Sequence, residues 1–104
     1  MAVAFDVLAE PNRRRILDLL CDGGEVPVNE LVGALSLSQP AVSKHLRVLR
    51  EAGLVEVRAE AQRRLYRIRP EPLAELDRWL AAYRRLWTRH LDLLEDHLDE
   101  RRTP

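Results

Sequence analysis

A single cysteine, Cys21, is present among the 104 residues. One cysteine cannot form a disulfide within the chain, and such scarcity is typical of proteins in a reducing cytosol. No apolar run approaches the roughly 20 residues of a membrane-spanning helix, and the first ten residues lack the basic segment of a signal peptide. We therefore expect a cytoplasmic protein with no membrane partner.

The sequence also lacks the motifs of common enzymes. It contains no glycine-rich phosphate loop, no nucleophile elbow and no His-Glu-x-x-His motif. We therefore expect a protein that is not an enzyme and binds no cofactor. The length predicts one small domain over residues 1–104.

The formal net charge is zero, which gives no overall attraction to nucleic acid. The charge is unevenly distributed, however, because residues 38–69 contain eight basic and three acidic side chains. DNA affinity follows the local field, so overall neutrality does not exclude DNA binding. The alternative interpretation is a solvated charged surface.

Residues 38–53 form the most informative segment. Ser38 can cap a helix by accepting hydrogen bonds from its first backbone N–H groups, and Gly53 can end that helix in a left-handed conformation. Apolar Val42, Leu46 and Leu49 recur at helical spacing and predict a buried face. The other face carries donors and cations suited to base edges and phosphates: Gln39, Ser43, Lys44, Arg47 and Arg50. This pattern predicts a recognition helix for a DNA groove.

The remaining patterns place this helix in a larger arrangement. Helical spacing occurs over residues 3–9, 11–21, 28–35 and 73–98, and residues 54–58 and 64–68 alternate as the strands of a hairpin do. We therefore expect a mainly α (α+β) fold, a winged helix-turn-helix with a long C-terminal dimerisation helix. The helix-turn-helix is expected at residues 28–53, and a two-stranded β-hairpin wing at residues 54–69. Because no glycine lies in residues 58–64, we expect a wing turn longer than two residues.

Four segments together resemble the ArsR/SmtB-like family of bacterial winged-helix repressors. They are LAEPNRRRILDLL (8–20), VNELV (28–32), LSQPAVSKHLRVLREAGLV (37–55) and RLYRI (64–68). The resemblance implies a homodimer that is joined by its first and last helices. It also implies repression of promoters through occupation of operator DNA.

The candidate DNA-binding residues fall into two groups. Gln39, Ser43, Lys44 and Arg47 are expected at base edges in the major groove, although each can instead contact a phosphate, which positions the protein but does not specify sequence. The full predicted set is Ser38, Gln39, Ser43, Lys44, Arg47, Arg50, Arg63 and Arg64. Arg50 is expected on a phosphate or in solvent, and the wing arginines in the minor groove or along phosphates. Arg13 matches a family position, with either a structural role or a role in DNA binding.

The final helix carries two apolar stripes, which is more than one small domain can cover. We expect one stripe to pack on its own domain and the other on a partner subunit; a single broad core face is the alternative. The predicted dimer interface contains Phe5, Leu76, Leu80, Tyr83, Trp87 and Leu94.

The family resemblance raises the question of a metal sensor. Members of this family often bind metals through cysteine pairs or histidine–carboxylate sets, and neither pattern occurs in this sequence. His90 and His97 reach the four ligands that zinc prefers only by symmetry, so we expect no metal site. Cys21 is expected in the core, and His45 is expected to be partly buried and satisfied.

We therefore expect a sequence-specific DNA-binding regulator, most simply a homodimeric repressor of an inverted-repeat operator on double-stranded DNA. One alternative is a metal- or thiol-responsive repressor with a site that the sequence does not reveal. A second alternative, from another class, is a winged-helix module that binds proteins.

Overall fold

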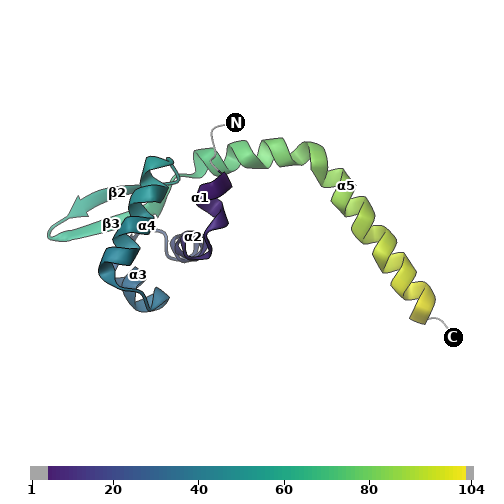
Figure 1. The fold of residues 1–104 in the computed structure, drawn as a ribbon. Coiled ribbons are helices and arrows are strands. Elements are labelled where there is room, and N and C mark those ends of the chain that lie inside the picture. The colour runs from purple at the N-terminus through teal and green to yellow at the C-terminus, as the bar shows by residue number, and fades with distance from the viewer. Residues whose placement is uncertain (1–4, 103–104) are drawn as a thin grey trace.

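The computed structural model describes the backbone of residues 5–102 and the side chains through Asp99. The elements are α1 (Phe5–Ala9), α2 (Pro11–Gly23), β1 (Val26–Pro27), α3 (Val28–Leu35), α4 (Gln39–Glu51), β2 (Val55–Glu60), β3 (Arg63–Ile68) and α5 (Pro70–Arg102). Figure 1 shows α1–α4 and the strands gathered in one domain, from which α5 extends as a long arm. The predicted winged helix-turn-helix is confirmed. The expected start of the first helix at residue 3 lies outside the described residues.

α3 has the predicted bounds, and the predicted three residues connect it to α4. α3 ends at Leu35, and the following residue, Ser36, adopts a left-handed conformation with φ of 56° and donates its N–H to the Val32 carbonyl. Ser38 then begins α4, since its hydroxyl accepts a hydrogen bond from the Ala41 N–H at 3.3 Å. The apolar side chains of both helices enter one core with α2 and the sheet: Ile16, Leu20, Leu31, Leu35, Val42, Leu46, Leu49, Leu54 and Val55. The apolar stripe of the predicted recognition helix is therefore buried as expected.

The wing differs from its prediction in two respects. The sheet has three antiparallel strands in the order β1-β3-β2, because Val26 and Pro27 pair with Tyr66 and Leu65. The expected long turn is wrong: Glu60 pairs with Arg63, so only two residues connect the strands. Ala61 has a φ of 54° at the first of these positions. A tight hairpin turn requires positive φ there, and alanine adopts it at a steric cost.

The junction of α1 and α2 is held by side chains of α2. Arg13 donates from Nε to the Val7 carbonyl at 2.6 Å and from Nη2 to the Asp6 carbonyl at 3.2 Å. Arg14 donates to the carbonyls of Leu8 and Ala9. The last carbonyls of a helix have no hydrogen-bond partner within the helix. These arginines therefore supply the missing donors to the carbonyls at the end of α1. Of the two roles expected for Arg13, these hydrogen bonds correspond to the structural one.

Gly53 follows α4 with a φ of 77°. Its N–H donates to the Arg50 carbonyl, and the Leu54 N–H donates to the Leu49 carbonyl, which turns the chain into β2. Gly53 therefore ends the helix segment in the predicted left-handed conformation.

Replacing Gly53 with alanine should lower the free energy of unfolding by about 1 kcal/mol, because a Cβ disfavours the left-handed conformation. No atom lies within 4 Å of the new Cβ, so the cost comes from the backbone alone. Urea denaturation measures it. Gly33→Ala is the matched control, because its Cβ also meets open space but lies in α3. That substitution should stabilise the protein by up to about 1 kcal/mol, and equal effects at both sites would contradict the argument.

α5 begins three residues earlier than predicted and its helix continues to Arg102, beyond the expected end at Leu98. Leu73 packs against the core, and Leu76 and Leu80 are half-buried. All described side chains from Ala81 to Asp99 are exposed. The expectation that one apolar stripe covers its own domain is therefore wrong for this stretch. Within residues 5–102, no helix combines the length and apolarity needed to cross a membrane.

Candidate nucleic-acid interface

α4 presents one polar face beside the wing. Ser38, Gln39, Ser43, Lys44, Arg47 and Arg50 are all exposed. The buried stripe of Val42, Leu46 and Leu49 fixes the rotation of the helix, because turning it would bring these side chains into water. The structure thus exposes all the predicted candidates of this segment, and Gln39, Ser43, Arg47 and Arg50 line one groove, whereas Ser38 and Lys44 lie outside it.

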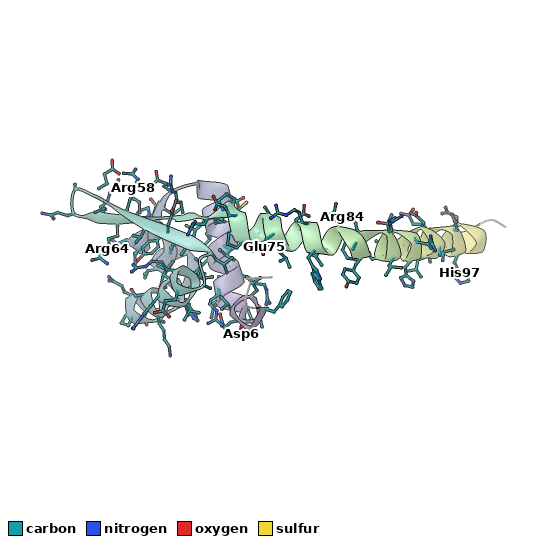
Figure 2. All side chains as sticks on the ribbon, turned by 90° about the horizontal axis from the view of Figure 1, so that it is seen from above. Asp6, Arg58, Arg64, Glu75, Arg84 and His97 are labelled. Carbon is teal, nitrogen blue, oxygen red and sulfur yellow. The ribbon has the colours of Figure 1, made fainter. Side chains whose placement is uncertain are left out.

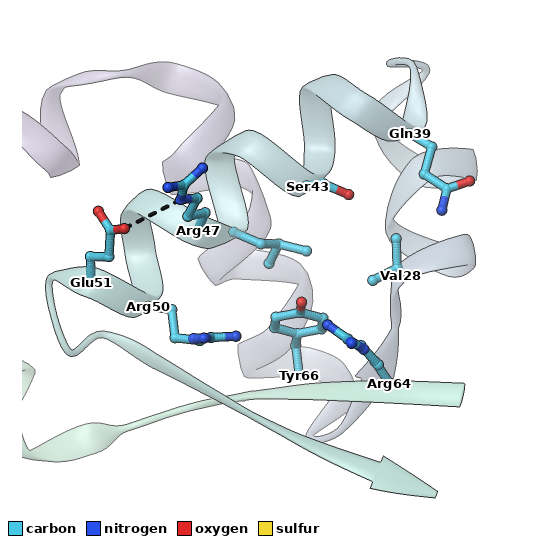
Figure 3. A pocket seen from close by; sticks show the side chains of 9 residues that line it. Val28, Gln39, Ser43, Arg47, Arg50, Glu51, Arg64 and Tyr66 are labelled. Carbon is cyan, nitrogen blue, oxygen red and sulfur yellow. Dashed lines mark hydrogen bonds and ion pairs between the residues drawn. The ribbon is translucent and has the colours of Figure 1, made fainter. Parts of the chain in front are cut away.

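A groove of about 630 Å³ runs between this face and β3. Its lining residues are Val28, Gln39, Ser43, Leu46, Arg47, Arg50, Glu51, Arg64 and Tyr66. Figure 3 shows the guanidinium groups of Arg50 and Arg64 approaching the Tyr66 ring from opposite sides. Helix and wing therefore contribute cations to the same groove.

The arginines of α4 differ in their surroundings. Arg47 pairs with Glu51 one turn later, with 3.3 Å between Nε and Oε1, and Figure 3 shows it directed toward Glu51 rather than Tyr66. Among the residues that the structure describes, Lys44 and Arg50 have no carboxylate partner. Arg50 is therefore the arginine of this helix whose charge is available to a ligand.

The wing has two faces of different character. Residues that pair across an antiparallel sheet share a face, and successive residues alternate between faces. Arg64 and Tyr66 lie on the face toward α4. Arg58, Arg63 and Arg67 lie on the other face, as Figure 2 shows for Arg58 and Arg64 on the two sides of the hairpin.

The far face of the wing is charge-compensated. Arg58 donates to both carboxylate oxygens of Glu25, Arg63 lies 3.6 Å from Glu60, and Arg67 pairs with Glu56. The hydrogen bond from Arg58 holds the pKa of Glu25 below its ordinary value, and Glu25 in turn raises the pKa of Arg58. Arg64 has no carboxylate partner within the described part of the chain, so the net positive charge of the wing faces α4.

A smaller groove of about 320 Å³ lies at the wing tip. It is lined by Pro27, Val28, Asn29, Gln39, Gln62, Arg63 and Arg64. Sequence reasoning missed Asn29, Gln62 and Tyr66. The available signal for Tyr66 was the alternation of β3, which places it on the same face as Arg64.

His45 differs from its prediction. Its side chain is only 18% exposed, as expected, and its Nδ1 lies 3.8 Å from Oε2 of Glu10. That Nδ1 is buried and has no hydrogen-bond partner, so the expectation of a satisfied histidine is wrong. Burial raises the pKa of Glu10, but hydrogen bonding from the Arg13 N–H and the charge of His45 outweigh it, and the pKa is lowered overall.

The predicted dimer residues lie outside the core. Phe5 of α1 contacts Trp79 of α5 with 5.9 Å between ring centroids, and Trp79 contacts Tyr83 at 5.1 Å. Phe5, Tyr83, Trp87 and Leu94 are between 42% and 51% exposed. An aromatic cluster thus joins α1 to an arm whose apolar side chains face water.

Two other predictions concern sensing. Cys21 is exposed near the end of α2, so its expected core position is wrong. Among residues 5–102 with described side chains, no group of three or more His, Cys, Asp or Glu is arranged to hold a metal ion.

Comparison with known proteins matches residues 10–57 to the family described as bacterial regulatory protein, arsR family. An HTH-type transcriptional regulator of Mycobacterium tuberculosis is 43% identical over 88 residues, which cover 85% of this chain and 78% of the relative. An arsenic resistance transcriptional regulator of Pseudomonas putida is 45% identical over 69 residues, covering 66% of this chain and 54% of that protein. The chain therefore matches only about half the length of this second relative.

The fold also matches a solved structure. The solution structure of a homodimeric winged helix-turn-helix DNA-binding domain from Mycobacterium bovis superimposes with a TM-score of 0.62 and 36% identity. The match covers 75% of this chain and 71% of that one. The fold, the matched helix-turn-helix and the sequence identity agree, and the chain belongs to the arsR family of bacterial regulatory proteins.

Proposed function

We propose that this protein is a homodimeric repressor of the cytoplasm that binds double-stranded DNA through α4 and the wing. The observation that carries the proposal is the distribution of uncompensated charge. Arg50 and Arg64 face one groove without carboxylate partners, whereas the arginines on the far face of the wing are paired. A polyanion is therefore attracted to the side of the domain where the recognition helix is exposed.

The polar face of α4 supplies the sequence recognition. Gln39 and Ser43 carry no charge and line the groove, so they suit hydrogen bonds to base edges better than simple attraction to phosphates. Lys44 is free to reach a guanine or a phosphate. Arg47 must break its ion pair with Glu51 before it can bind DNA. We therefore expect Arg47 to contact a base only where that contact makes two hydrogen bonds.

Arg50 and Arg64 hold the DNA backbone. They approach Tyr66 from α4 and from β3 respectively, so one phosphate in the groove bridges the recognition helix and the wing. Ser38 lies at the start of α4, where the helix dipole also favours a phosphate. Arg63 is the weaker wing candidate, because Glu60 already neutralises it.

The salt dependence of DNA binding tests this assignment. Each phosphate neutralised contributes about −0.9 to the slope of log affinity against log salt. If Arg50 and Arg64 share one phosphate in each subunit, the double alanine variant of the dimer should flatten the slope by about 1.8, which is about 0.9 per subunit. Arg67→Ala removes a paired arginine on the far face and serves as control. A change near 3.6 would indicate two separate phosphates in each subunit, and no change would refute a backbone role.

Base reading is tested separately with Gln39→Ala and Ser43→Ala. Each should weaken binding to the operator by about 1–3 kcal/mol while leaving non-specific binding and the salt slope unchanged. Fluorescence anisotropy with operator and scrambled duplexes measures both. Equal losses on the two duplexes would show that these side chains do not read bases.

Selection from a random DNA library identifies the operator. We expect an inverted repeat with half-sites about one helical turn apart, because a two-fold dimer presents two recognition helices. Parallel selections with zinc and with an oxidant test for an inducible site. Loss of enrichment with either addition would favour a metal- or thiol-responsive repressor, and no enrichment at all would favour a protein-binding module.

A further inference from the structure

His45 is a largely buried titratable side chain of α4 that the proposed DNA contacts leave unused. It comes directly before Leu46 of the buried stripe, and its side chain is 18% exposed. Among the described side chains, its Nδ1 is the one buried nitrogen or oxygen atom without a hydrogen-bond partner. Leaving such an atom unpaired is unfavourable. A state of the ring in which Nδ1 gains a partner would therefore be more stable.

The partner within reach is the carboxylate of Glu10, which caps α2. Its Oε2 accepts a hydrogen bond from the Arg13 N–H at 2.9 Å, and its Oε1 accepts one from Nδ2 of Asn12 at 3.4 Å. Oε2 also lies 3.8 Å from Nδ1 of His45. A carboxylate oxygen can accept two hydrogen bonds, so Oε2 has room for a second donor. A charge-assisted hydrogen bond is about 2.7–2.9 Å long, so an approach of about 1 Å would complete the contact.

Glu10 is the one carboxylate within ion-pair distance of His45 among the described residues. α2, α3 and β2 pack against α4. On α2, the guanidinium of Arg13 donates to carbonyls of α1 and not to Glu10. Lys44 and Arg47 of α4 oppose a positive charge on the ring, but both are exposed, so water and salt screen them. The other charged residues of α2, α3 and β2 make no ion pair with His45: Arg14, Arg15, Asp18, Asp22, Glu30, Glu56, Arg58 and Glu60.

The chemistry of the two groups makes this contact depend on a proton. A histidine side chain ordinarily changes charge between about pH 5 and 8, and protonation makes both of its ring nitrogens donors. Burial raises the pKa of Glu10, but the hydrogen bond from the Arg13 N–H and the charge of His45 lower it overall. The carboxylate therefore stays ionised over the pH range in which a histidine gains its proton.

We propose that His45 is a positioning residue of α4, which on protonation closes onto Glu10 and fastens the recognition helix to the start of α2. The folded protein offers the protonated ring a partner that the unfolded chain lacks. The stabilisation is therefore present at low pH and is lost as the pH rises through the histidine range. It is also lost below the lowered pKa of Glu10, where the carboxylate is protonated.

The contact affects DNA binding because His45 adjoins the reading face. Ser43 and Lys44, which directly precede it, are exposed. A second anchor beside the buried stripe restricts the movement of α4 and holds these side chains in one geometry. Operator binding requires that geometry, whereas binding to a random duplex depends mainly on charge. For its effect on DNA this inference rests on the proposed function, but the contact itself does not.

Thermal unfolding of the full-length protein at pH 8 and pH 5.5, at one protein concentration, tests the contact without DNA. The difference in melting temperature between the parent and His45→Gln should grow by about 4 °C at the lower pH. Glu10→Gln should show the same change, because the amide still offers an oxygen to cap α2 but no charge to His45. The double variant should lose no more than either single variant. His90→Gln, which replaces an exposed histidine of α5, is the matched control and should keep the parent's pH profile.

A difference between parent and variant that is equal at both pH values, or additive losses in the double variant, would overturn the contact. Affinities for the operator and for a scrambled duplex then test positioning. Between pH 8 and pH 5.5 the ratio of these affinities should rise at least about five-fold in the parent and stay constant in His45→Gln and Glu10→Gln. An equal gain on both duplexes would show an added charge only and overturn the positioning role. Absence of operator binding at every pH would instead refute the proposed function, while the unfolding data would still decide the contact.

Discussion

Replacement of Trp87 with glutamate should yield monomers that bind the operator about 100-fold more weakly than the parent protein. Trp87 lies on the apolar face of α5 and is 42% exposed in the single chain, so the indole is available to a partner. Burying a carboxylate at its place in an apolar interface is unfavourable. Two linked half-site contacts exceed one by roughly 10²–10⁴ in affinity, and a monomer loses that gain.

Sedimentation velocity and operator titration measure the two effects on the same sample. Leu80→Glu should act in the same direction, although Leu80 is already half-buried in the single chain. Ala81→Glu is the control, since Ala81 lies on the back of α5 among arginines. A Trp87→Glu protein that stays dimeric would show that this face is not the interface. A monomer with undiminished operator affinity would separate dimerisation from DNA binding.

Local signals predict the helix-turn-helix with accuracy. The Ser38 hydroxyl caps α4, and Gly53, which has no Cβ to disfavour positive φ, turns the chain away after it. The stripe of Val42, Leu46 and Leu49 is buried because its spacing admits only one inward face. α3 also has its predicted bounds. These features depend on residues that are neighbours in sequence, so the sequence alone determines them.

The wing and α5 depend on contacts that sequence periodicity does not contain. β1 has only two residues, too few for an alternating pattern. It forms because its residues pair with the edge of β3. Ala61 adopts positive φ because the pairing of Glu60 with Arg63 closes the turn around it. The two stripes of α5 correctly indicate excess apolar surface, but their spacing does not show that the helix leaves the domain.

In the candidate site, too, some features follow from the local sequence and others only from the fold. Composition identifies the arginines of residues 38–69, yet it does not distinguish paired from unpaired ones. Glu25 neutralises Arg58 from 33 residues away, a pairing that only the fold creates. The alternation of β3 is local and separates Arg64 from Arg63, but the significance of that separation emerges once α4 is known to cover one face of the sheet.

Replacement of Leu46 with alanine should remove about 2–5 kcal/mol from the free energy of unfolding, because it leaves a cavity in the core. Leu46 is 1% exposed and packs in the cluster shared by the helices and the sheet. Small domains have only about 5–15 kcal/mol of stability, so a sizeable fraction of the variant is expected to unfold on mild heating. Urea denaturation at fixed protein concentration measures the loss.

Comparison with Ser43→Ala separates the loss of folded protein from the loss of a DNA contact. Ser43 lies three residues before Leu46 on the same helix but is exposed, so its removal should change stability by less than about 0.5 kcal/mol. Both variants are expected to bind the operator less well. In Leu46→Ala the loss should disappear when binding is corrected for the folded fraction, whereas in Ser43→Ala it should remain. A corrected affinity that stays low in Leu46→Ala would mean that the cavity also shifts α4, and that the buried stripe positions the reading face as well as stabilising it.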